Sequence, residues 1–418
     1  MRIRRWKLSL LAVLLVLMSG LVSSAGQVTI HFLSFFVTKD EQLARSLIAD
    51  FEKANPDIRI ELEIKPYRDV AQQTLVRVAG GTPPDVIDLH PSNLYSFCRQ
   101  GIFLDITDRV HRELDVSDFF PAVLESVSLN GRIYAMPQRI STYVLFFNTD
   151  LFDEAGLQYP SKDWQDASWN WDAFYEAGKR LRRDIDGDGK VDVYGSWTDT
   201  RVEQKFLPFM FQAGAELFDE EYTTFRLVEE PGLRAIRFVQ QALVEEIIIN
   251  STTPWYQGRC GMGVDIPPSM IDFGSQATFG FDVAALPQGP AGPGTTIQPI
   301  PVGIVAQSKH HEASWRFLKY YMSREVAEQH SRAGIIVQPR RSVTGNVRNY
   351  PAVGITDMRP FIGALSVGRM VPNQHAEFPQ IATMINNALG PVWKGLADPR
   401  PVLEGIRGAV EELLRTPR

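Results

Sequence analysis

Strand-like and helix-like apolar patterns alternate near the start of the chain, and this alternation restricts the fold more than any other feature. Residues 28–32 read as a first strand, and the apolar residues of 43–51 recur at helical spacing. Residues 58–64 alternate apolar and polar, 70–78 predict another helix, and 84–87 open a third buried strand. Strands separated by helices favour parallel βαβ units and therefore an α/β fold.

In open sheets of this kind, ligands bind beyond the carboxyl ends of the strands. We therefore expect binding residues in the loops after Phe32, Leu89 and Gly195.

Residues 130–157 combine turn, strand and helix signals over a short distance. Residues 131–137 read as a tight hairpin that ends in a proline, and 143–147 form a dense apolar run typical of a buried strand. Asn148 is a candidate N-cap for a short helix that Gly156 would end.

The N-terminal segment has the order of a secretory signal. Basic residues (Arg2, Arg4, Arg5, Lys7) precede an apolar core over residues 8–18, and small residues at 23–25 predict cleavage before Gly26. The core is shorter than the ~20 apolar residues of a membrane-spanning helix. No cysteine follows it, so a lipid anchor of the bacterial type is not expected. The alternative is an uncleaved N-terminal anchor.

Charge and length exclude several classes of protein. The 418-residue chain carries a net charge of −6, and loss of the four basic residues of the signal would take it to −10. An acidic chain without a basic cluster is a poor nucleic-acid binder. About 390 mature residues exceed one typical core, so two domains are expected. Cys98 and Cys260 do not form a disulfide framework.

The motifs together resemble the sugar-binding, maltose-binding-protein-like family of extracellular solute-binding proteins of ABC importers. In that family, a hairpin, a proline, a crossover strand and a capped helix carry the chain from one lobe to the other, and residues 130–157 resemble this order. Further segments resemble family motifs in the same order (Gly81–Val86, Gly101–Thr107, Gly258–Met262, Leu286–Pro290, Lys309–Leu318, and Gly334 with Pro339).

The resemblance implies a two-lobe periplasmic-binding-protein fold of type II, in which each lobe is a mixed sheet flanked by helices. Residues 1–25 would be the signal peptide, 26–139 and 298–334 the N-lobe, and 140–297 and 335–418 the C-lobe. Hinge closure would capture a carbohydrate between the lobes. The protein would then deliver the sugar to an ABC membrane permease as an exported, soluble monomer, without catalysis.

Sugar recognition requires aromatic faces for C–H groups and paired polar groups for hydroxyls. The predicted ligand-binding residues are Phe35, Phe36, His90, Ser92, Asn93, Arg139, Ser141, Tyr143, Trp197, Asp265 and Arg340. For the aromatic residues among them, the alternative is a role in core packing.

One acidic loop resembles the start of a calcium site. Asp184, Asp186, Asp188 and Asp192 offer oxygens at alternating positions, with glycine at the sharp turn. The twelfth position, normally a bidentate glutamate, is Gly195. The alternative is a polar turn whose aspartates cap their own backbone. Otherwise, no cofactor is expected.

Two rival functions remain open from sequence alone. A secreted glycoside hydrolase would share an aromatic and acidic cleft, but it needs two suitably spaced carboxylates. A binding protein for a polyamine or a metal chelate would share the fold. No HExxH helix, GxSxG elbow or complete phosphate-binding loop supports another enzyme class.

Overall fold

The computed structural model describes residues 26–35, 38–267, 269–333, 337–344, 357–373 and 375–416. The predicted signal segment, Phe36 and Gly334 lie outside these residues. Within the described part, no helix has the length and apolar character needed to cross a membrane.

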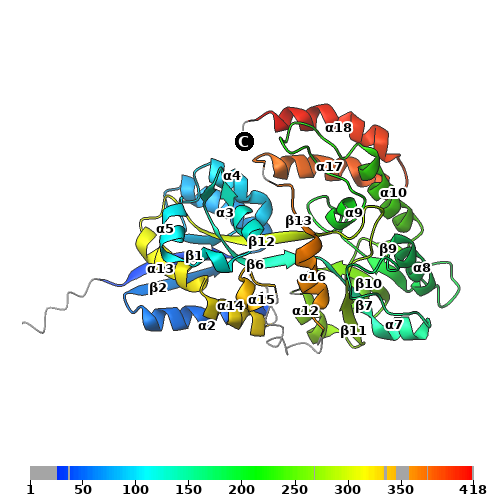
Figure 1. Cartoon of the computed structure of the whole chain (residues 1–418), viewed down its shortest axis with the longest axis horizontal. Coiled ribbons are helices and arrows are strands. Elements are labelled where there is room, and N and C mark those ends of the chain that lie inside the picture. Colours follow the sequence, from blue (N-terminus) through cyan, green and yellow to red (C-terminus); the bar gives the residue numbers. More distant parts are fainter. Residues whose placement is uncertain are drawn as a thin grey trace, which may run out of the picture.

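Two sheets form the centres of two lobes (Figure 1). The first sheet has the order β13-β12-β3-β1-β2, and a further strand, β6, pairs with β12. Its strands are β1 (Val28–Ser34), β2 (Ile58–Ile64), β3 (Val86–Asp88), β6 (Met136–Thr142), β12 (Thr295–Ile304) and β13 (Gly368–Met370). The pairs β1–β2 and β1–β3 are parallel, as the alternating pattern predicted.

Helices cover the first sheet and separate its parallel strands. They are α2 (Thr38–Ala54), α3 (Tyr67–Ala79), η1 (Pro91–Asn93), α4 (Leu94–Arg99), α5 (Thr107–Glu113), η2 (Val116–Asp118), α6 (Pro121–Glu125), α13 (His311–Tyr321), α14 (Arg324–Arg332) and α15 (Arg341–Thr344). A small hairpin joins β4 (Ser128–Leu129) to β5 (Arg132–Ile133), so its turn lies at the start of the segment 131–137 that was predicted as a hairpin. Asn130 and Gly131 both have positive φ there.

The second sheet has the order β11-β7-β10-β8-β9. Its strands are β7 (Val144–Asn148), β8 (Tyr194–Trp197), β9 (Ile248–Ile249), β10 (Cys260–Asp265) and β11 (Phe281–Ala284). The helices of this lobe are α7 (Thr149–Glu154), α8 (Trp171–Leu181), α9 (Leu207–Gln212), α10 (Glu230–Val244), α11 (Thr253–Tyr256), α12 (Ser269–Gln276), α16 (Arg359–Val367), α17 (Phe378–Trp393) and α18 (Pro399–Leu414).

The chain changes sheets at Tyr143, between β6 and β7. The predicted first-lobe segment ends at residue 139, but β6 continues through Thr142 because it pairs with β12 along its length. Figure 1 shows β6 and β12 running from one lobe toward the other. The strand β13, from the predicted second-lobe segment, also pairs with β12 in the first sheet.

Local sequence signals account for several boundaries. The Asn148 side chain accepts a hydrogen bond from the Leu151 amide at 3.1 Å, which confirms the predicted N-cap of α7. Gly156 has φ of 59° just beyond that helix, a conformation that glycine adopts without a steric penalty. The two cysteines are buried and free, as expected.

Candidate functional site

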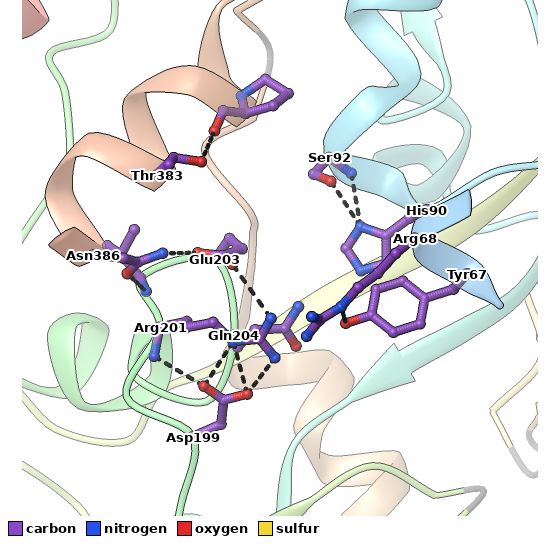
Figure 2. Close-up of polar contacts among 12 residues, drawn as sticks. Tyr67, Arg68, His90, Ser92, Asp199, Arg201, Glu203, Gln204, Thr383 and Asn386 are labelled. Carbon is purple, nitrogen blue, oxygen red and sulfur yellow. Dashed lines mark hydrogen bonds and ion pairs between the residues drawn. The ribbon is translucent and has the colours of Figure 1, made fainter. Parts of the chain in front are cut away.

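A cavity of about 370 Å³ lies between the lobes and is lined from both sides. Its first-lobe wall comes from the start of α3 and from η1, with Tyr67, Arg68, His90, Ser92 and Asn93. Its second-lobe wall comes from the loop after β8 and from α17, with Arg201, Glu203, Gln204, Phe378, Pro379, Ala382 and Thr383. Figure 2 shows the polar members of these two walls facing each other.

The first-lobe wall presents an aromatic face beside a neutral imidazole. The rings of Tyr67 and His90 lie 5.4 Å apart at an angle of 37°. The His90 Nδ1 atom lies 2.8 Å from the Ser92 hydroxyl and accepts from the Ser92 amide at 3.4 Å. Burial lowers the pKa of His90 to about 4, and the positive charges of Arg201 and Arg68 act in the same direction. The imidazole is therefore neutral at pH 7.

The loop from Asp199 to Lys205 places four charged groups on the second-lobe wall or beneath it. The Arg201 Nε atom donates to both Asp199 carboxylate oxygens at 3.0 Å, and its Nη1 atom lies 3.9 Å from Glu203. Burial raises the pKa of Asp199, but the hydrogen bonds and charge of Arg201 outweigh it and hold that pKa below its usual range. The Asp199 hydrogen bond raises the pKa of Arg201, and contact with the Tyr67 hydroxyl adds to that shift.

Beneath this loop, the carboxyl ends of β8 and β10 bring together three residues predicted from sequence. Trp197 ends β8, Asp265 ends β10, and Tyr143 lies at the crossover. The Lys205 ammonium lies 3.9 Å from the centre of the Trp197 ring and 3.1 Å from Asp265 Oδ1. Burial lowers the pKa of Lys205, and Asp265 partly offsets this effect. The Tyr143 hydroxyl donates to Gln204 Oε1 at 3.1 Å.

Trp197 itself is 1% exposed, so its ring faces the interior in this structure. Lys205 covers one part of it, and Phe273 meets it edge-on at 6.4 Å. Its role as a sugar-stacking residue stays a prediction, because the ring is buried and Trp197 does not line the cavity.

The remaining predicted residues lie in different surroundings. Phe35 is half-buried and lies under the Arg139 guanidinium at 5.9 Å, with Tyr67 as its ring neighbour at 6.4 Å. Arg139 and Ser141 belong to β6, where Ser141 pairs with Gln298 of β12. Phe35, Arg139 and Ser141 do not line the cavity. Their ligand contacts stay predictions.

Arg340 was expected on the second lobe, but its contacts are to the first. Its guanidinium donates to the Met322 carbonyl at 2.8 and 3.0 Å and pairs with Asp118 at 3.1 Å. It also lies over the Phe119 ring at 4.4 Å. These contacts hold the guanidinium inside the first lobe, because the charge of an arginine that is only 6% exposed requires internal partners.

The acidic loop lies away from this cavity and is exposed. Oxygens of Asp184, Asp186 and Asp188 come within 4.8 Å of one another. Asp184 also accepts from the Gly187 and Gly189 amides, and Asp192 accepts from the Ile185 amide. These bonds match the self-capped turn that was the alternative, and the calcium prediction stays open.

Sequence reasoning missed several residues of the cavity wall. Tyr67 and Arg68 begin a helix and carry no motif. Arg201, Glu203 and Gln204 follow a strand end whose loop was singled out, so the polar run after Trp197 was a usable signal. No signal pointed to α17, because only the tertiary structure brings it to the cavity.

A cavity between two α/β lobes that share crossing strands defines the class of two-lobe binding proteins. The chain belongs to the family of bacterial extracellular solute-binding proteins, whose model matches residues 38–328.

Individual relatives agree with this membership. A binding protein of Brucella abortus is 23% identical over 99% of this chain and 100% of its own length. The arabinooligosaccharide-binding protein of Bacillus subtilis is 23% identical over 50% of this chain and 46% of its own. An ABC substrate-binding protein of Listeria monocytogenes, solved in complex with cycloalternan, has a TM-score of 0.82 at 19% identity, covering 93% of this chain and 99% of its own.

Proposed function

We propose that this protein captures a carbohydrate in the cavity between its lobes and delivers it to an ABC import permease without breaking a bond. The observation that carries the proposal is the composition of the cavity wall. It joins an aromatic face from one lobe to a guanidinium, a carboxylate and an amide from the other. Pyranose C–H faces stack on aromatic rings, and hydroxyls pair with planar polar groups.

The comparisons support the choice of carbohydrate as ligand class. The Bacillus relative is named for an arabinooligosaccharide, and the Listeria structure contains cycloalternan. We further propose that the mature protein is exported, free of a lipid anchor and monomeric. Because the ligand would touch both lobes, its binding would favour the closed arrangement and so mark the loaded protein for the permease.

The direct test is thermal unfolding of the purified protein with mono-, di- and oligosaccharides, followed by analysis of each sugar. A ligand that binds only the folded state raises the midpoint, and the sugar should be recovered intact. Cleavage of any linkage would favour the hydrolase. A shift with polyamines or metal chelates, but with no carbohydrate, would overturn the sugar assignment.

A pair of tyrosine variants places the binding site. Tyr67→Ala removes the aromatic face from the cavity and should weaken sugar binding at least tenfold. Tyr159→Ala removes a partly exposed tyrosine of the second lobe that lies outside the cavity, so it should leave affinity unchanged. Equal affinities for the two variants would place the sugar elsewhere.

A further inference from the structure

Asn386, on the helix α17, makes two hydrogen bonds to the loop that carries the charged groups of the cavity. Its Oδ1 atom accepts from the Val202 amide at 2.8 Å, and its Nδ2 atom donates to Glu203 Oε2 at 2.7 Å. Figure 2 shows these bonds on the side of the loop that faces α17. Since one bond needs an acceptor and the other a donor, the pair matches an amide and no other side chain of this size.

Asn386 is the main anchor of the Glu203 carboxylate. Within the described part of the chain, the hydrogen-bond and ion-pair partners of Glu203 are Asn386 and, at 3.9 Å, Arg201. Separate contacts hold the two ends of the loop. Thr200 accepts from Asn250 at 3.0 Å, and Lys205 pairs with Asp265 at 3.1 Å. Arg201 is bound to Asp199, and Gln204 accepts from the Tyr143 hydroxyl, so the parts of the loop that depend on α17 are the Val202 amide and the Glu203 carboxylate.

The same helix also forms part of the cavity wall. Ala382 and Thr383 line the cavity and lie four and three residues before Asn386, so all three share one side of α17. A shift of the helix would move the wall and the Glu203 carboxylate together. The family model ends at residue 328, so α17 lies beyond the matched region.

We propose that Asn386 is a positioning residue that fixes the Glu203 carboxylate on the second-lobe wall for ligand binding. The inference rests on the proposed function for its ligand, but its chemistry holds for any ligand of this cavity. It assigns part of the ligand preference to the helix α17, which lies beyond the residues matched by the family model.

The decisive variant is Asn386→Asp. It keeps the size of the side chain and the acceptor for the Val202 amide, but it places a second carboxylate against Glu203. Like charges disfavour this arrangement, so affinity should fall at least tenfold at pH 7. The double variant Asn386→Asp/Glu203→Gln reverses the donor and acceptor roles and should regain part of that loss.

The matched control is Asn387→Asp, the same change one residue along α17. Asn387 is exposed and does not line the cavity. Its variant should bind like wild type. Calorimetry separates an effect on affinity from a loss of folded protein. A merely structural role would lower the fraction of protein that binds ligand and leave Kd unchanged. Wild-type Kd for Asn386→Asp, or no recovery in the double variant, would overturn the proposal.

A ligand-free measurement keeps this test separate from the proposed function. Hydrogen exchange of residues 199–205 in the unliganded protein should rise in Asn386→Ala, while Asn386→Asp should keep the Val202 amide protected. Failure of every sugar to bind wild type would refute the carbohydrate assignment alone. Unchanged exchange in Asn386→Ala would refute the positioning role alone.

Discussion

The close contact between Gly263 and Trp197 gives a prediction that can be worked out from the geometry. These residues pair across the parallel strands β8 and β10. A Cβ atom added at Gly263 would lie 2.0 Å from Nε1, 2.3 Å from Cε2 and 2.7 Å from Cδ1 of the Trp197 ring. Gly263→Ala therefore cannot be accommodated without moving the indole.

The size of the effect follows from how firmly that ring is held. Trp197 is buried between Lys205 and Phe273, so it has little room to shift. Overpacking of a core costs about 1–3 kcal/mol, and displacement of the whole ring places this site at the upper end. Because alanine restricts the unfolded chain more than glycine does, the substitution also stabilises the protein by about 0.4–1 kcal/mol. We expect a net loss of about 2–2.5 kcal/mol.

Denaturant unfolding followed by circular dichroism measures this loss, and Gly405→Ala is the matched control. Gly405 lies exposed within α18, and an added Cβ there would meet nothing within 4 Å. Alanine is a better helix former than glycine by roughly 1 kcal/mol. The same chemical change should therefore stabilise the protein at Gly405 and destabilise it at Gly263.

A double-mutant cycle attributes the loss to the indole. In a Trp197→Phe background, the smaller ring leaves room for the new methyl group, so Gly263→Ala should cost less than about 1 kcal/mol. The reasoning is refuted if Gly263→Ala alone stays within about 0.5 kcal/mol of wild type, or if its cost is the same with phenylalanine at position 197.

Three further predictions concern charged groups. Asp265→Asn leaves the buried Lys205 ammonium without its carboxylate and should lower the free energy of unfolding by about 3 kcal/mol in denaturant unfolding. The double variant Asp265→Asn/Lys205→Met should recover stability. A loss below about 0.5 kcal/mol in Asp265→Asn would contradict this prediction. Because the pKa of His90 is lowered from 6.5 to about 4, the unfolded state binds the proton first as pH falls. Between pH 6.5 and pH 4, the free energy of unfolding of the wild type should therefore fall by about 2–3 kcal/mol more than that of His90→Gln. Equal dependence of unfolding free energy on pH in the two proteins would refute this prediction. The acidic loop beginning at Asp184 lacks the twelfth-position glutamate, so the thermal unfolding midpoint should be the same in roughly 0.1 mM calcium as in a calcium chelator. A midpoint several degrees higher in calcium would show a tighter site.

Local signals predicted those parts of the fold that depend on neighbouring residues. The helix α2, the strand β2 and the N-cap at Asn148 follow from apolar periodicity and backbone capping, which act over a few residues. The family motifs then indicated the two-lobe architecture. Trp197, Asp265 and Tyr143 were chosen separately, and they meet because strand ends converge at one edge of the second sheet.

By itself, the sequence determined the α/β class, because apolar periodicity is a short-range pattern, and its family motifs indicated the two lobes. The loop after β8 stays a predicted binding region. Only the tertiary structure decided which side chains face the cavity. It brings α17 against the loop of Arg201 and Glu203, about 180 residues earlier in the chain. It also assigns Arg340 to packing on Phe119 and covers Trp197 with Lys205. Such contacts depend on where whole elements pack, and no local pattern of residues records that.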